Sequence, residues 1–305
     1  MTKLHRVLTA VDFTESARAA FDHALALSRF HDAELMVVHA VPANRPFTWD
    51  APERIDLIGA LRGAARSAGV RFKASIQHRD PAGAILLPGK ARKADLIVLG
   101  TSRQSWFDGF RFDSVAERVA LEATQPVLVV PPESTVTDDS IAPFKSILVA
   151  LDFREGSMEI VERALSMAHG DSRITVVHVV RGVPLESASR YMYHLMEPEY
   201  QRQLTRDAWR RMPAFISADA TTARRVHARV VTGDPAAAIS RVAAEADADL
   251  IIMGAKARGA FGRMIFGSTA ARVIRTAGRP VLVMPRLTSE AAAAGDEGQQ
   301  ELGHA

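Results

Sequence analysis

An internal repeat constrains the fold of this chain more than any other feature of its sequence. The stretch Val-Leu-Thr-Ala-Val-Asp-Phe at residues 7–13 returns as Ile-Leu-Val-Ala-Leu-Asp-Phe at residues 147–153. Asp80 and the proline after it return as Asp234 and its proline, and this offset of 154 then holds to the last apolar run of each copy. Such self-similarity indicates two copies of one domain.

Each copy alternates apolar runs with amphipathic segments. In the first copy, runs typical of strands buried on both faces occupy residues 7–11, 35–41, 72–77, 96–99 and 127–130. The segments between them have helical periodicity, with Ala20, Phe21 and Ala24 on one face of the first. Alternation of this kind is typical of parallel sheets with helices on both faces. We therefore predict an α/β fold of two tandem, doubly wound, five-stranded parallel sheets.

Composition indicates where the domains begin and end. Residues 133–143 are polar, begin after two prolines and lack an apolar period, so we interpret them as a linker between domains at residues 1–132 and 144–287. Residues 288–305 are rich in alanine, glycine and acidic side chains, and we predict a disordered tail there.

The second copy is longer than the first by 15 residues. The extra length lies within residues 182–223, which hold all three tyrosines, Tyr191, Tyr193 and Tyr200. One interpretation is a longer surface helix with aromatic packing. The other is a lid or a partner surface over a ligand site, and the sequence leaves both open.

The composition also excludes several classes of protein. With 305 residues, 48% hydrophobic and 24% charged, the chain is long enough for two globular domains. No apolar run approaches the roughly 20 residues that span a bilayer, so we expect no membrane segment. The first predicted strand begins near His5, which leaves no room for a signal peptide, and the absence of cysteine fits a cytoplasmic protein. A net charge of +3 without a basic cluster predicts no nucleic-acid binding.

Residues 249–285 contain the strongest candidate for a binding site. An apolar run ends at Gly254, a loop with glycine and arginine follows, and a helix is predicted to begin at Gly267-Ser268-Thr269. The first N–H groups of a helix lack partners within it, and the helix dipole makes that end positive. Glycine also lets a phosphate approach the backbone without meeting a Cβ. The stretch predicts an anion site, and a tight turn with an ordinary serine cap is the alternative.

The spacing resembles the nucleotide loop of the universal stress protein family, written Gly-x2-Gly-x9-Gly-Ser/Thr. Gly254, Gly267 and Ser268 fall at matching positions, and Ala257 stands where the family has its second glycine. The resemblance covers nearly all of residues 1–286. It implies, for each copy, the strand order 3-2-1-4-5 of an adenine nucleotide alpha hydrolase-like fold. It also implies that the ligand is ATP or another adenine nucleotide.

The resemblance also assigns the site residues. In an open parallel sheet, ligands bind beyond the carboxyl ends of strands where the strand order reverses. With the family's order, that point lies between Asp152 and the loop after Gly254. By resemblance, Asp152 binds the adenosine and Val179 lines the adenine pocket, whereas a cap for the following helix is the alternative role of Asp152. The other predicted site residues are Met253, Gly254, Ala257, Gly267, Ser268 and Thr269.

The first copy departs from the family pattern. Gly100 and Ser114 remain, but Arg103 replaces the second glycine and Asp113 the third. A carboxylate at Asp113 would repel phosphate, because like charges within about 4–6 Å disfavour each other. We therefore predict a structural or interaction half that binds no nucleotide, with an ion pair between Asp113 and Arg103 as an alternative occupant of the site.

Two further features carry structural expectations. Pro88-Gly89 lies in the predicted third helix of the first copy, which it should break or kink. His39 and His178 occupy the same place in the two copies, which predicts a structural role at the end of a strand.

No catalytic constellation emerges from the sequence. The histidines show no metal-ligand spacing, and neither a Gly-x-Ser-x-Gly elbow nor a complete P-loop is present. We therefore predict no catalytic residues, no metal and no enzyme activity beyond slow hydrolysis. Three functions stay open. We favour an ATP-binding stress-response module that signals through unidentified protein partners, ahead of a slow ATPase and an interaction protein that binds no nucleotide.

In each copy, the last predicted strand would leave one edge of its sheet unpaired. Residues 127–130 and 281–284 are apolar and flanked by prolines, and edges of this kind are usually covered. Members of the family commonly pair through their last strand. We expect the two strands to pair within one chain, as a pseudo-twofold dimer of domains, and a homo-oligomer remains an option.

The first testable prediction concerns Ala257. Ala257→Gly removes a methyl group that holds a polyphosphate away from the loop backbone, so the affinity for ATP should rise or stay unchanged. Equilibrium dialysis of the wild-type and variant chains against ATP measures this. A large loss of affinity in the variant would show that the steric role given to Ala257 is wrong.

Overall fold

The computed structural model describes residues 3–41, 52–101, 115–136, 143–181, 190–216, 225–255 and 267–285. The first half comprises β1 (Arg6–Ala10), α1 (Glu15–His31), β2 (Glu34–Val41), α2 (Pro52–Ser67), β3 (Phe72–His78), α3 (Pro81–Ala91), β4 (Leu96–Gly100), α5 (Val115–Glu122) and β5 (Val127–Val130). The second half comprises β6 (Ser146–Leu151), α6 (Ser157–Met167), β7 (Arg173–Val180), α7 (Arg190–Arg211), the 3-10 helix η2 (Met212–Phe215), β8 (Val226–Thr232), α9 (Pro235–Glu245), β9 (Leu250–Gly254), α10 (Ser268–Thr276) and β10 (Val281–Met284).

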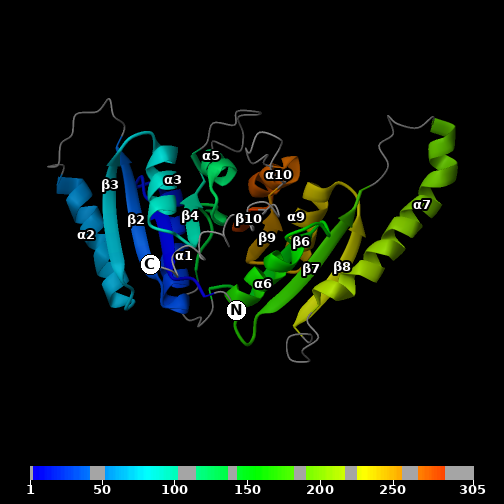
Figure 1. Cartoon of the computed structure of the whole chain (residues 1–305), viewed down its shortest axis with the longest axis horizontal. Helices are drawn as coiled ribbons and strands as arrows, with labels where there is room; N and C mark the ends of the chain where they lie inside the picture. The colour runs from blue at the N-terminus through cyan, green and yellow to red at the C-terminus, as the bar shows by residue number, and fades with distance from the viewer. Residues whose placement is uncertain are drawn as a thin grey trace, which may run out of the picture.

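The strands of the described residues form one sheet in the order β3-β2-β1-β4-β5-β10-β9-β6-β7-β8 (Figure 1). Within each half the strands are parallel and follow the predicted order 3-2-1-4-5. The halves meet where β5 and β10 pair antiparallel, with Leu282 opposite Leu128. The predicted pairing of the last strands within one chain is therefore confirmed, and it merges the two predicted sheets into one.

Helices cover both faces of this sheet, and successive strand residues point to opposite faces. Val7 belongs to the core that α1, α2, α6 and α7 cover, and Leu8 belongs to the core beneath α3, α5, α9 and α10. Each core contains residues of both halves. Burial of one such aliphatic side chain stabilises the fold by about 1.5–3 kcal/mol. In the described part of the chain, no helix combines the length and the apolarity needed to cross a bilayer.

Two predicted segments fall largely outside the described residues. The tail at residues 288–305 lies outside them entirely, as do residues 137–142 of the predicted linker.

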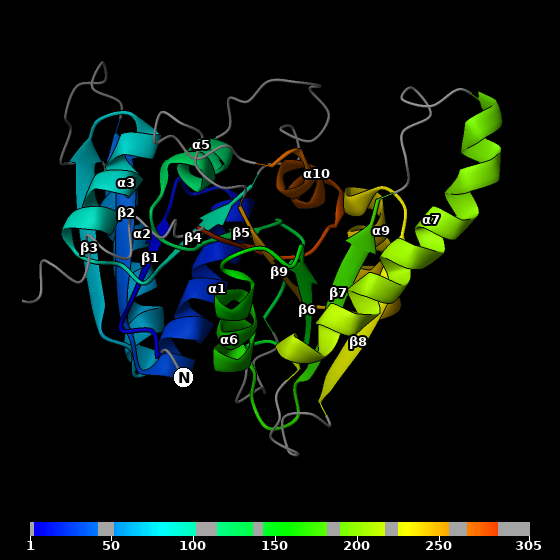
Figure 2. The same ribbon diagram turned by 45° about the vertical axis from the view of Figure 1, so that its right-hand side comes forward.

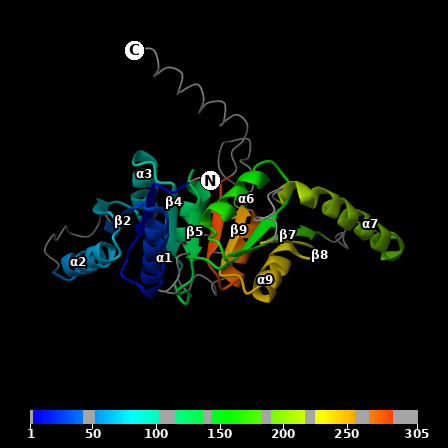
Figure 3. The same ribbon diagram turned by 90° about the horizontal axis from the view of Figure 1, so that it is seen from below.

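The extra length of the second copy contains α7, a helix of 22 residues, whereas α2 at the equivalent place has 16. The two helices lie at opposite ends of the sheet (Figure 3). The longer helix of the first interpretation is therefore present, while a lid or partner surface stays a hypothesis.

The two Asp-Pro pairs begin helices in the same way. Asp80 and Asp234 are the N-cap residues of α3 and α9, and each carboxylate accepts an N–H from three residues further on, at 3.0 Å. Such a cap stabilises a helix by about 1 kcal/mol. Each carboxylate also accepts from an arginine of the neighbouring helix, Arg118 at 3.0 Å and Arg272 at 2.8 Å.

The paired histidines are structural, as predicted. His39 Nδ1 donates to the carbonyl oxygen of Val11 at 2.8 Å, and His178 Nδ1 donates to that of Leu151 at 2.9 Å. Each ring therefore ties the carboxyl end of its strand to the end of the neighbouring strand. Burial lowers the pKa of His178, so this ring stays neutral near pH 7.

Pro88 does not break its helix, which corrects one of the two outcomes expected from the sequence. α3 runs through Pro88 and has 11 residues, as α9 does. The N–H of Arg92 still donates to the Pro88 carbonyl at 2.9 Å, so the last turn closes. Pro88 and Gly89 are both buried, and a Cβ at Gly89 would lie only 3.3 Å from Cδ1 of Ile97. Packing against β4 therefore holds this helix together.

A buried histidine lies where the two halves meet. α1 and α6 run side by side at this junction (Figure 2), and the rings of Phe30 and His169 are 6.3 Å apart across it. His31, the last residue of α1, is buried there, and its Nε2 has no hydrogen-bond partner. Burial lowers the pKa of His31 to about 4, and the positive charges of Arg163 and Lys3 contribute to the shift.

His31 makes the stability of the chain depend on pH. Its folded pKa of about 4 lies below the ordinary 6.5, so the unfolded chain binds more protons between these values. Stability is therefore lost as the pH falls from about 6.5 to about 4. His31→Leu should remove roughly 2–3 kcal/mol of this loss. Urea unfolding from pH 7 to pH 4 measures the difference, with His227→Leu, at an exposed site on β8, as control. Parallel pH profiles for wild type and His31→Leu would contradict the prediction.

Candidate functional site

The carboxyl ends of three strands meet at one edge of the second half. β6 pairs with β7 on one side and with β9 on the other, where Ala150 lies opposite Met253. Asp152 follows β6, so it lies near Gly254 at the end of β9. This is the point where the strand order reverses, and such points position ligands in open α/β sheets.

A cavity of about 640 Å³ lies at this edge. Its described lining includes seven of the eight residues predicted from the sequence: Asp152, Val179, Met253, Gly254, Gly267, Ser268 and Thr269. The eighth, Ala257, lies outside the described residues. The structure thus brings the predicted residues together, and nucleotide binding by them stays a prediction.

The start of α10 gives the cavity its hydrogen-bond donors. Gly267 is the N-cap residue, and because it has no side chain it cannot cap the first N–H groups of the helix. The residues from Gly267 to Ala270 all line the cavity. The dipole of the helix favours an anion at this end by about 0.3–1 kcal/mol at an exposed site. The geometry therefore suits a phosphate or a carboxylate.

Asp152 lies at the cavity and does not cap the helix that follows it. α6 begins at Ser157 and has Gly156 as its N-cap, so the capping role considered for Asp152 is wrong. Asp152 Oδ1 instead accepts the N–H of Arg154 at 3.2 Å, and Oδ2 lies 3.8 Å from Arg154 Nε. With 46% of its side chain exposed, the carboxylate is accessible to a ligand.

Two arginines of the cavity were missed by the sequence analysis. Arg154 follows β6 by three residues, and Arg181 follows β7 directly. Arg181 Nη2 lies 3.4 Å from Thr269 Oγ1, so its guanidinium reaches the start of α10. A guanidinium donates two parallel hydrogen bonds to a phosphate. In the sequence, each of them is only an arginine shortly after a predicted strand, and this pattern is too common to indicate a binding residue. The three loop cations, Lys256, Arg258 and Arg263, lie outside the described residues.

A smaller hollow of about 380 Å³ adjoins the start of α10. Arg181, Thr269, Asp234 and Arg272 all line it. The backbone N–H of Ala237 and the side chain of Arg272 lower the pKa of Asp234, which therefore stays ionised at neutral pH. Arg272 is engaged by this carboxylate, which leaves Arg181 better placed to meet an anionic ligand.

The equivalent edge of the first half is closely packed at Gly100. A Cβ on Gly100 would collide with the backbone of Ser16, in the first turn of α1. α1 begins three residues after Asp12, whereas α6 begins five residues after Asp152. The first turn of α1 therefore lies against the end of β4. The replacements Arg103 and Asp113, and the ion pair considered for them, lie outside the described residues.

Comparison with known proteins decides the family. The model of the universal stress protein family matches residues 3–131 and again residues 143–285. The chain belongs to this family. Among its relatives, the "universal stress protein in QAH/OAS sulfhydrylase 3'region" of Thermus aquaticus is 35% identical over 144 residues, which are 46% of this chain and 98% of the relative.

Solved structures of universal stress proteins share the fold. One from Archaeoglobus fulgidus DSM 4304 covers 92% of this chain and 96% of its own, with a TM-score of 0.65 and 19% identity. A universal stress protein in complex with cAMP covers 43% of this chain and all of its own, with a TM-score of 0.38 and 24% identity. At 19% identity, the likeness to the Archaeoglobus fulgidus structure shows the fold alone.

Proposed function

We propose that the second half of this universal stress protein binds an adenine nucleotide, with ATP as the expected ligand. One observation carries the proposal. A single cavity of about 640 Å³ collects Asp152, Val179, Gly254 and the uncapped start of α10. Small-molecule sites in proteins measure about 300–1,000 Å³, so the volume suits a nucleotide.

The chemistry of the lining divides between the parts of a nucleotide. The N–H groups at Ser268 and Thr269 and the guanidinium of Arg181 are suited to phosphate oxygens. The carboxylate of Asp152 can accept a hydrogen bond from a ribose hydroxyl. Val179, at the end of β7, offers an apolar contact for adenine.

As a cellular role, we propose a binding and signalling module of a stress response, acting in the cytoplasm through protein partners. Bound nucleotide would alter the surface around the cavity, and a partner would bind that surface. Two other functions remain as hypotheses. An interaction protein that binds no nucleotide would follow if Ala257 closes the loop to phosphate, and a slow ATPase would follow if the bound ATP is hydrolysed.

Gly267→Asp tests the position of the phosphates. An aspartate at this N-cap would accept the N–H groups that the phosphates need and would repel them by charge. The helix should persist, because aspartate is a favourable N-cap residue. We expect the affinity for ATP to fall at least tenfold, about 1.4 kcal/mol. Equilibrium dialysis measures it.

The matched control is Gly170→Asp, which adds the same charge at an exposed glycine with open space for a Cβ. Its affinity for ATP should equal that of the wild-type chain. Unchanged affinity in Gly267→Asp would show that the phosphates bind elsewhere. An equal loss in both variants would show a general effect of charge.

Asp152→Ala tests whether the nucleotide is a signal or a substrate. Phosphoryl transfer needs charge neutralisation, usually by a metal, and a group that orients the nucleophile. Among the described lining residues, Asp152 is the single carboxylate, and the proposal assigns it to the ribose. We therefore expect ATP to persist on the protein or to turn over only very slowly, as chromatography of the nucleotides after incubation would show. Steady multiple turnover that is lost in Asp152→Ala, with binding retained, would make the protein an enzyme.

A further inference from the structure

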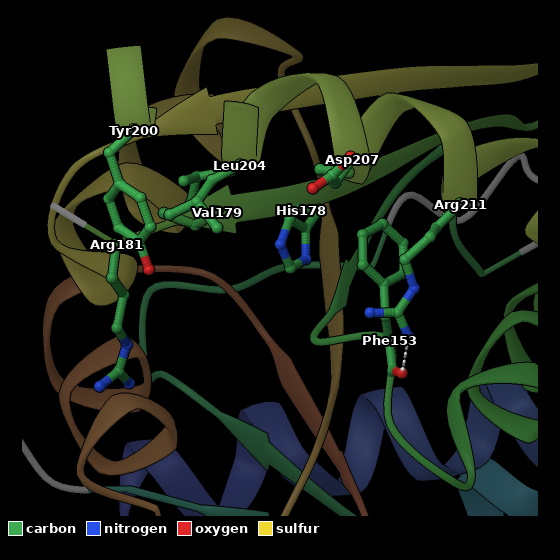
Figure 4. Close-up of a pocket in the computed structure, with 10 residues that line it drawn as sticks. Phe153, His178, Val179, Arg181, Tyr200, Leu204, Asp207 and Arg211 are labelled. Atoms are coloured by element: carbon green, nitrogen blue, oxygen red, sulfur yellow. Dashed lines mark hydrogen bonds between the residues drawn. The ribbon is translucent and has the colours of Figure 1, made fainter. Parts of the chain in front are cut away.

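A second cavity, of about 600 Å³, lies between β7 and α7 (Figure 4). Val180 and Ala208, which line it, belong to the core on the side of α6 and α7. Val177 and Ile239, which line the cavity of the proposed nucleotide site, belong to the opposite core. The two cavities therefore extend toward opposite faces of the sheet, and they share His178, Val179 and Arg181 at the carboxyl end of β7.

One wall of this second cavity is a stack of flat groups around Phe153. The rings of Phe153 and His178 stack with centroids 4.1 Å apart, and the guanidinium of Arg211 lies 4.9 Å from the centroid of Phe153. Arg211 Nη2 also donates to the carbonyl oxygen of Phe153 at 2.6 Å, which holds the guanidinium in place (Figure 4). Phe215 stacks on Phe153 at 5.4 Å. These groups give this end of the cavity an aromatic and guanidinium surface, of a kind on which aromatic rings pack.

A second part of the lining is apolar and comes from α7, the helix that also supplies Arg211. Leu204 and Ala208 lie on the same helix face, four residues apart, and Val180 of β7 extends this surface. Tyr200 lies one turn further, at the open end, where 49% of the residue is exposed. Figure 4 shows Tyr200 and Arg181 together at this end and Phe153 and Arg211 at the other.

The polar groups of the cavity favour an anion at the open end. Asp207 is held by Arg210 at 3.2 Å, and Arg211 is engaged by Phe153. His178 is neutral, since burial lowers its pKa, and its Nδ1 is bonded to Leu151. The hydroxyl of Tyr200 and the guanidinium of Arg181 remain as donors at the open end, and among the described contacts this guanidinium has only a 3.4 Å hydrogen bond to Thr269.

We propose that this cavity binds a flat, mainly apolar molecule with one anionic group, of the class of aromatic carboxylates and sulfonates. Its ring packs on the group around Phe153 and on the side chains of Leu204 and Ala208, which line the same cavity. Its anionic group lies at the open end, near Tyr200 and Arg181. The apolar and aromatic lining of this site, from Phe153 and α7, takes no part in the proposed nucleotide site, but the two sites share Arg181.

The test is a fluorescence titration of the full chain with 8-anilinonaphthalene-1-sulfonate, an aromatic sulfonate. We expect saturable binding of one probe molecule per chain. Ala208→Phe fills the cavity with a ring and should weaken binding at least tenfold. Gln203→Phe adds the same ring to α7 at an exposed position outside the lining, and it should bind the probe as the wild-type chain does.

Circular dichroism shows whether Ala208→Phe folds. If it does not, a second variant still tests the proposal. Tyr200→Ala truncates a half-exposed side chain at the open end and should weaken binding several-fold. Retained affinity in Tyr200→Ala and in a folded Ala208→Phe would overturn the proposal. Saturating ATP should leave one probe molecule bound, with its affinity lowered at most several-fold because both ligands use Arg181. Complete displacement by ATP would place the probe in the other cavity and also overturn the proposal.

Discussion

The antiparallel pairing of β5 with β10 is the contact on which the rest of the structure depends. Both strands are four residues long and buried throughout. Left at an edge, each would expose an apolar row and unpaired backbone groups, which promotes association with other chains. Their pairing makes them the centre of one continuous sheet and lets both hydrophobic cores pass through the junction. The remaining edges are β3 and β8, most of whose residues are only partly buried.

This pairing also gives the first half a part in the candidate site. β10 contacts β5 on one side and β9 on the other, where Met284 lies opposite Gly254. The end of β9 that lines the 640 Å³ cavity is therefore supported, through β10, by a strand of the first half. The first half departs in sequence from the family's nucleotide loop. It still supports the second half, because its strand β5 pairs with β10.

The sequence predicted the fold well because the fold rests on local patterns that repeat. Apolar runs, the Asp-Pro helix starts and the family's strand order together predicted both halves and their pairing. The stability of α3 across Pro88 could not be predicted, because it depends on the packing of Gly89 against Ile97 from another strand. In the 640 Å³ cavity, Gly254, Gly267 and Ser268 were found through a spaced motif, and Asp152 and Val179 through the family resemblance. Arg181 belongs to no motif. The second cavity has no local signal, since its stacked wall joins Phe153 to Arg211, 58 residues away.

Comparing the two halves shows which contacts stabilise the fold and which lie at a candidate site. In the first half, Thr14 caps α1 and its hydroxyl donates to Asp12 at 2.6 Å, so the aspartate after β1 supports the start of a helix. In the second half, Arg154 stands in the place of Thr14, and α6 begins two residues later. Asp152 then contacts this arginine at the cavity, and it has no part in the helix cap. The aspartate after the first strand thus supports the start of a helix in the first half and lines a cavity in the second. The two halves differ at the residue two positions later, which is Thr14 in one and Arg154 in the other.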